Sequence, residues 1–349
     1  MRHKWRQWRG GAPLPIPNRE VKPRRDDDTA RKRGKVVRRP PLTESPHHIG
    51  AGFLALWQPK LFFLSFHAFF LSLHLNCLDM KELLTRSISG LVFGIVVVTC
   101  IFLSPLTLAA LLMSVVAVGT FEMCRLHGIT DSLHLGIVEA ITIVSFVVGG
   151  LVGLGLFSCR WLLLELLFMC IPFLFALFSK KLRHESILAC CYASLSFLSL
   201  PSVMLLFMYR QDLFGSLAGP WLVLLVFVLL WVNDIFAYLS GRLIGKHKLF
   251  ERISPGKTIE GSIGGLLFTT IAVVAFGHYA DWLPMNAAVG MGVIAVVFGT
   301  LGDLCESMLK RQAGVKDSGR LIPGHGGILD RFDSVLFSVP FIFVYLLLL

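Results

Sequence analysis

Charged side chains are scarce in this sequence. They account for 16% of the 349 residues and hydrophobic ones for 55%, whereas soluble domains carry about 25% charged residues. The mean hydropathy is +0.71. This composition excludes an ordinary soluble domain. It predicts an all-α polytopic integral membrane bundle, because a helix satisfies its own backbone hydrogen bonds in lipid.

Cysteine patterns typical of zinc sites and disulfide frameworks are also absent. The sequence has eight cysteines but no C-x-x-C pair, and no dense group of histidines and cysteines. Several cysteines lie in or beside apolar runs: Cys100, Cys159, Cys170, Cys190 and Cys191. We interpret them as small hydrophobic residues.

We find no internal repeat, which argues against a transporter of anionic metabolites. The ionisable groups gather at one face of the expected bundle instead of its midplane. Glu165, within WLLLELLF, is the residue that favours transport. The alternative is that it bonds a neighbouring helix.

The basic residues are concentrated at the N-terminus, where residues 1–49 carry +9 of the formal net charge of +11. This composition is typical of a disordered, solvated tail. The functional alternative is a surface that attracts anionic lipid headgroups or nucleic acid, and we expect no nucleic-acid partner. Residues 52–78 are apolar but interrupted by Pro59, Lys60 and two histidines. We therefore divide the chain into a basic, disordered or wrongly included extension, 1–79, and a transmembrane domain, 80–349, with Met80 as the hypothetical initiator.

Nine apolar runs after Met80 are long enough, or nearly so, to span a bilayer. They are 88–104, 106–121, 137–158, 161–178, 187–208, 219–240, 262–278, 286–304 and 333–349. With the Met80 end inside, sixteen flanking Lys and Arg residues fall on the inner side and only Arg160 and Arg210 on the outer side. The positive-inside rule then places the large polar loops in the cytoplasm.

The densest polar segment is Ser307–Asp333, SMLKRQAGVKDSGRLIPGHGGILDRFD, between two of these runs. It combines carboxylates that can hold a cation with basic groups that can hold phosphates. Gly326 and Gly327 beside His325 can adopt positive φ and turn backbone N–H groups toward a ligand. The segment predicts a metal-assisted reaction on phosphates.

A second polar region begins near the end of the run at 219–240. Asp234 and Tyr238 are four residues apart and share one helix face. A carboxylate in lipid is costly unless it is paired or coordinated, so Asp234 marks a functional site or, alternatively, a tie to a neighbouring helix.

The sequence SPGKTIEG, at 254–261, superficially matches a Walker A loop. Glu251 stands where that motif needs glycine, and no strand pattern precedes it, so we reject a P-loop. Ser254, Lys257 and Thr258 instead precede a helix start near Gly261, which favours an anion. The alternative for Lys257 is that it snorkels at the membrane interface.

The run at 286–304 continues into GDLCESMLKRQAG, where Asp303, Ser307 and Lys310 recur on one helical face. Glu306 is interpreted either as part of this face or as a simple i,i+4 partner of Lys310. Magnesium prefers oxygen ligands and bridges carboxylates to substrate phosphates. We predict a Mg²⁺ site on Asp303 and Asp330, supported by Asp234.

The segment Ser307–Asp333 reads S-x-x-K-R-x4-K-D-x-G-x-x-I-P-x-H-G-G-x-x-D-R-x-D, which resembles the signature of phosphatidate cytidylyltransferases. The elements D-x-x-A-Y-x-x-G from Asp234 and S-P-x-K-T-x-E-G from Ser254 are similar to others in that family. The resemblance covers residues 80–349. It implies transfer of a cytidylyl group from CTP to phosphatidic acid in a bacterial inner membrane, with a homodimer possible. CTP-dependent polyprenol or phytol kinases are the enzymatic alternative.

The resemblance also implies roles for individual residues. The predicted catalytic residues are Lys257, Lys310, Arg311, Lys316, Asp317, His325, Arg331 and Asp333. The predicted substrate-binding residues are Ser254, Thr258, Ser307, Gly326 and Gly327. No strong base is expected, because a phosphate monoester has a second pKa of about 6 and is largely anionic at neutral pH.

Overall fold

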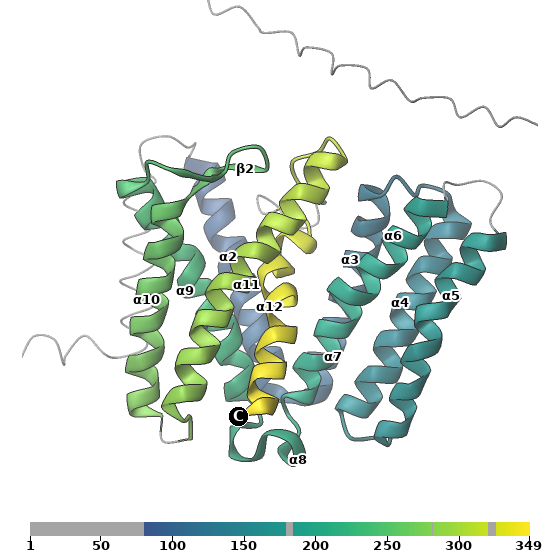
Figure 1. Cartoon of the computed structure of the whole chain (residues 1–349), viewed down its shortest axis with the longest axis horizontal. Helices are drawn as coiled ribbons and strands as arrows, with labels where there is room; N and C mark the ends of the chain where they lie inside the picture. Colours follow the sequence, from purple (N-terminus) through teal and green to yellow (C-terminus); the bar gives the residue numbers. More distant parts are fainter. Residues whose placement is uncertain (1–79, 179–183, 281, 320–325) are drawn as a thin grey trace, which may run out of the picture. The chain divides into compact units, whose positions relative to one another are not determined.

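A computed structural model describes residues 80–178, 184–280, 282–319 and 326–349 (Figure 1). The predictions made for residues 1–79 and for His325 lie outside these residues.

The described chain is almost entirely helical. Its elements are α2 (Met80–Leu103), α3 (Pro105–Leu126), α4 (Ser132–Gly153), the 3-10 helix η1 (Cys159–Leu163), α5 (Leu164–Phe178), α6 (His184–Ser194), the π-helix η2 (Leu195–Ser199), α7 (Leu200–Phe207), α8 (Gln211–Phe214), the 3-10 helix η3 (Gly215–Leu217), α9 (Pro220–Ile244), β1 (Lys248–Phe250), β2 (Ser254–Thr258), α10 (Ile259–Tyr279), α11 (Met285–Gln312) and α12 (Leu329–Leu348).

Eight helical segments in the described residues are long and apolar enough to cross a membrane, and Ile88–Leu103 of α2 is a shorter apolar one. They correspond to the nine predicted runs, so the all-α polytopic bundle is confirmed. The helices extend beyond the apolar runs into polar sequence: α11 ends at Gln312 instead of 304. This extension carries polar side chains to the end of the bundle.

Local sequence explains the break between the first two helices. Ser104 has an extended backbone, and its hydroxyl accepts a hydrogen bond from the Leu106 N–H at 2.9 Å. Pro105 occupies the first turn, where its missing N–H costs nothing. A cap and a proline therefore separate two runs that composition hardly distinguishes.

The helices form two neighbouring groups in Figure 1, α3–α7 and α9–α12. Helix α12 packs on α11 and α9 in its own group and on α7 and α3 in the other. The Phe332 side chain of α12 is buried and makes edge-to-face contacts with Phe93 and Phe227. The start of α12 thus packs against α2 and α9, which matters because it carries Asp330 and Asp333.

Helices α9 and α10 approach closely through Gly261 and Gly265. A Cβ at Gly261 would lie 2.7 Å from the Ala237 carbonyl oxygen, and one at Gly265 would overlap with the Asn233 amide oxygen. These glycines let the two backbones come together. The contact places Asp234 of α9 near the start of α10.

We expect Gly265→Leu to lower the thermal stability of the purified protein. Inserting a side chain into a packed contact costs about 1–3 kcal/mol. Gly136→Leu in α4 is the matched control, because a Cβ there meets no atom within 4 Å. Unfolding temperatures in detergent that are equal for the two variants would contradict the role of Gly265.

The hairpin of β1 and β2 was not predicted. The two strands pair antiparallel, with Lys248 opposite Thr258 and Phe250 opposite Ser254. The expectation of no strand before SPGKT was therefore wrong, since β1 precedes it and the motif is itself a strand. The P-loop is still rejected, because β2 leads directly into α10 and leaves no glycine-rich loop.

The described residues also bear on Glu165 and on the cysteines. The Ser145 hydroxyl of α4 donates to Glu165 Oε2 at 2.7 Å, so Glu165 bonds a neighbouring helix. The seven described cysteines are free. Neither feature indicates transport or a disulfide framework.

Candidate active site

A cavity of about 640 Å³ lies where α9, β2, α10, α11 and α12 meet. The predicted site residues that line it are Asp234, Ser254, Lys257, Thr258, Asp303, Ser307, Lys310, Arg311, Lys316, Asp317, Asp330, Arg331 and Asp333. The fold thus brings together two polar regions that are about 70 residues apart in sequence. Gly326 and Gly327 do not line the cavity.

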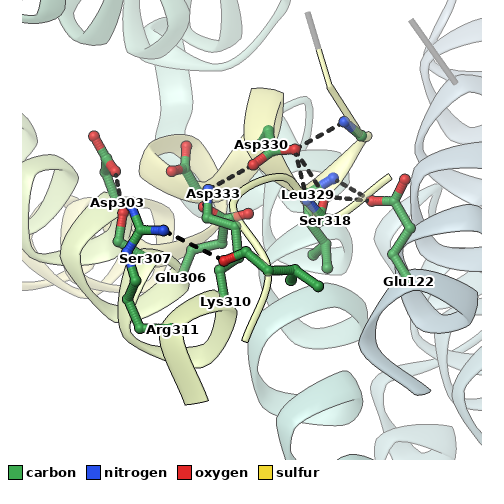
Figure 2. A network of polar contacts seen from close by, with 12 residues as sticks. Glu122, Asp303, Glu306, Ser307, Lys310, Arg311, Ser318, Leu329, Asp330 and Asp333 are labelled. Atoms are coloured by element: carbon green, nitrogen blue, oxygen red, sulfur yellow. Dashed lines mark hydrogen bonds and ion pairs between the residues drawn. The ribbon is translucent and has the colours of Figure 1, made fainter. Parts of the chain in front are cut away.

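Helix α11 supplies one wall through residues three or four positions apart (Figure 2). The Ser307 hydroxyl donates to Asp303 Oδ1 at 3.2 Å. The Lys310 ammonium pairs with Glu306 and lies 2.6 Å from Asp330 Oδ1 on α12. The predicted helical face is confirmed, and its lysine neutralises two carboxylates that are almost fully buried.

Three carboxylates in the described residues lie close enough to share an ion: Asp303, Glu306 and Asp333, with ligand oxygens within 4.8 Å of one another. Glu306 is 1% exposed, and its Oε1 has no hydrogen-bond partner among the described residues. A buried carboxylate oxygen without a donor is costly unless a cation or water meets it. The set of oxygen donors fits a divalent cation such as Mg²⁺.

Asp330 has a different environment from the one predicted. Its Oδ2 accepts hydrogen bonds from the Ser318 N–H at 3.0 Å and the Gly327 N–H at 2.8 Å, and it lies 3.0 Å from the Ser318 hydroxyl oxygen. With Lys310 on Oδ1, the carboxylate is already well supplied with donors. Asp330 as a metal ligand therefore stays a prediction, while the geometry groups Asp303 with Glu306 and Asp333.

Lys257 reaches Asp303 of the three-carboxylate group from β2. Its ammonium lies 2.6 Å from Asp303 Oδ2 and 3.5 Å from the Thr300 carbonyl oxygen. A lysine beside an acidic cluster can neutralise it and can also meet a phosphate held there. Asp234 and Tyr238 both line the cavity from α9, so the predicted shared face is confirmed.

Two other predicted residues have local structural roles. Thr258 is the N-cap of α10, and its hydroxyl accepts from the Gly261 N–H at 3.1 Å. The Arg311 guanidinium donates to the carbonyl oxygens of Ile253 at 3.3 Å and Val315 at 3.4 Å. Arg311 thus ties the β-hairpin to the end of α11 while it lines the cavity.

The glycines after His325 accommodate carboxylates of the protein. Gly326 has φ of +84°, the positive φ that was predicted, and a Cβ there would lie 2.6 Å from Asp330 Oδ2. Gly327 does not have a positive φ, so that expectation was wrong for it. The Gly327 N–H donates to the same oxygen. In the described structure this N–H therefore turns toward Asp330, and substrate binding by Gly326 and Gly327 stays a prediction.

Residues 84–349 match the model of the cytidylyltransferase family. The chain belongs to the cytidylyltransferase family. The match includes every residue that lines the cavity, so the cavity lies within the part of the chain that matches the family model.

Curated relatives of this cytidylyltransferase-family chain include phosphatidate cytidylyltransferases. The one from Staphylococcus aureus (strain COL) is 50% identical over 127 residues, which are 36% of this chain and 48% of the relative. The one from Staphylococcus saprophyticus is 42% identical over 156 residues, 44% of this chain and 59% of the relative. The matched region spans about half the length of these relatives.

Sequence reasoning missed two acidic residues near the site. Glu306 was considered as a partner of Lys310, which is confirmed, but was not placed in the metal group. Glu122 was not considered, because the predicted run ended at residue 121 whereas α3 continues to Leu126. A charged residue inside a buried helix was the signal that could have identified Glu122.

Proposed function

We propose that this chain transfers a cytidylyl group from CTP to phosphatidic acid, forming CDP-diacylglycerol and releasing pyrophosphate. The observation that carries the proposal is the cavity, in which three grouped carboxylates lie beside several lysines and arginines. The names of the relatives support the two substrates. The membrane-spanning helices around the cavity suit a lipid substrate.

The charge balance of the cavity favours binding of a nucleotide together with a cation. Its described lining contains six acidic and six basic side chains. A triphosphate alone would add several negative charges beside carboxylates, which is unfavourable in a site of low dielectric. We propose that Asp303, Glu306 and Asp333 hold Mg²⁺, which would supply charge neutralisation to the phosphates.

In the proposed reaction an oxygen of the lipid phosphate attacks the α-phosphorus of CTP. A P–O bond forms there as the bond to the β-phosphate oxygen breaks, and pyrophosphate leaves with the electron pair. The lipid phosphate needs no strong base because it is already largely anionic. Basic side chains that line the cavity, such as Lys257, Lys316 and Arg331, would stabilise the charge on the transferring and leaving phosphates.

We place the cavity on the cytoplasmic side of a bacterial plasma membrane. Arg210 lies just before α8, at the opposite end of the bundle from the β-hairpin in Figure 1, as the positive-inside assignment requires. CTP would then enter from the cytoplasm and the lipid from the bilayer. A homodimer remains part of the proposal, and the mass of the detergent-solubilised protein tests it.

Purified protein incubated with labelled CTP, phosphatidic acid and Mg²⁺ tests the reaction. We expect CDP-diacylglycerol and pyrophosphate in equal amounts. A CTP-dependent kinase would release CDP instead.

Chelation of divalent cations should abolish turnover, and added Mg²⁺ should restore it, because the carboxylates would otherwise repel the triphosphate. The measurement is product formation before and after EDTA treatment and Mg²⁺ addition. Full activity in excess EDTA would contradict the metal assignment.

A further inference from the structure

Glu122 is a buried carboxylate of α3 that reaches the segment between α11 and α12. Its side chain is 3% exposed, and its Oε1 accepts from the Ile328 N–H at 3.1 Å. Its Oε2 accepts from the Leu329 N–H at 2.9 Å and from the Ser318 hydroxyl at 2.9 Å. Figure 2 shows Glu122 extending from its own helix toward Ser318 and Leu329. Such bonds to a carboxylate are among the stronger ones in proteins.

The two backbone donors belong to the N-terminus of α12. Ile328 is the N-cap residue, and its side chain forms no capping hydrogen bond. The first N–H groups of a helix lack partners within the helix, and here a carboxylate about 200 residues earlier in the sequence meets two of them. Glu122 therefore acts as a remote cap that fixes the start of α12 against α3.

Ser318 links this cap to the cavity. Its hydroxyl lies between Glu122 Oε2 and Asp330 Oδ2, and its N–H donates to Asp330. Lys316 and Asp317, which directly precede it, line the cavity. A shift of Glu122 would thus move Ser318 and, with it, the wall that carries these two residues.

The surrounding backbone is shaped to admit the Glu122 carboxylate. A Cβ at Gly319 or at Gly327 would overlap with its oxygens. Both positions therefore need glycine for space. Two glycines and three hydrogen-bond donors surround the Glu122 carboxylate, which indicates that it has a defined position.

We propose that Glu122 is a positioning residue for the reaction at the cavity, a role that rests on the proposed function. It does not line the cavity. It acts through the first turn of α12, which carries Asp330 and is followed one turn later by Asp333, and through Ser318. In this way α3 contributes to a site that is otherwise built by α9–α12.

The test is Glu122→Gln in the full chain. The amide has the same shape but only one acceptor oxygen, and its NH₂ group faces a backbone N–H. We expect kcat to fall about 10- to 100-fold, the range for residues that orient metal-site ligands, with KM for CTP and phosphatidic acid unchanged. Hydrogen exchange at residues 328 and 329, followed by mass spectrometry, should become faster. Ser318→Ala should lower kcat as well, and the double variant should lose less than the product of the two effects.

Asp131→Asn is the matched control, because Asp131 caps α4 through the His134 N–H and does not line the cavity. It should leave kcat and the exchange at 328 and 329 unchanged. Normal kcat in Glu122→Gln, with product formed by the wild type, overturns this inference and leaves the proposed function standing. No product from the wild type overturns the proposed function and, with it, the catalytic role of Glu122.

Discussion

The Asp303→Asn variant is expected to lose essentially all cytidylyl transfer while remaining folded in the membrane. Asp303 belongs to the three-carboxylate group and pairs with Lys257 at 2.6 Å. An amide would weaken cation binding and leave the lysine without its counter-charge. A metal ion contributes several kcal/mol of charge stabilisation, so we expect a rate loss of about 10³-fold or more. The measurement is product formation per mole of detergent-purified protein.

Asp212→Asn is the matched control for this prediction. Asp212 also pairs with a basic residue, Arg210, and the Arg210 Nε donates to its Oδ1 at 2.9 Å. Neither residue lines the cavity, so the variant should keep its rate. A near-normal rate for Asp303→Asn would remove Asp303 from the metal assignment, whatever the control shows.

The Lys310→Met variant is expected to lose both activity and stability. Lys310 is 12% exposed and pairs with Glu306 and Asp330, which are 1% and 8% exposed. Removing the cation leaves two buried carboxylates facing each other. Breaking a buried pair by removing one partner costs about 3–5 kcal/mol. Thermal unfolding of the purified protein and product formation are the two measurements.

The Lys257→Met variant separates the loss of activity from the loss of stability. Lys257 and Asp303 are 26% and 35% exposed, so solvent screens the charge left behind. Pairs of this kind contribute about 0–1 kcal/mol, and we expect reduced activity with nearly normal stability. Adding Glu306→Gln to Lys310→Met should restore part of the stability but not the activity. Equal unfolding temperatures for Lys257→Met and Lys310→Met would contradict the account of Lys310 as a buried counter-ion.

The predicted helix ends differ from the observed ones for a physical reason. A hydropathy pattern reports where lipid can surround a helix, and it fades where the helix enters a polar environment. Helix α11 therefore continues to Gln312, beyond the predicted end of the run at 304. Helix α3 likewise passes residue 121 and carries Glu122 into the bundle. The residues missed at the site lie in these extensions.

Composition and local spacing are properties of consecutive residues, so the sequence alone predicted the membrane class, the nine apolar runs and the two polar regions. It also placed Asp303, Ser307 and Lys310 on one helical face, because the 3.6-residue period is local. Only the tertiary structure decided which carboxylates meet. Asp330 accepts hydrogen bonds from Ser318 and Gly327. Glu306 and Asp333 lie beside Asp303. Glu122 reaches the start of α12. These contacts depend on how helices far apart in the chain pack, and residue spacing carries no information about that.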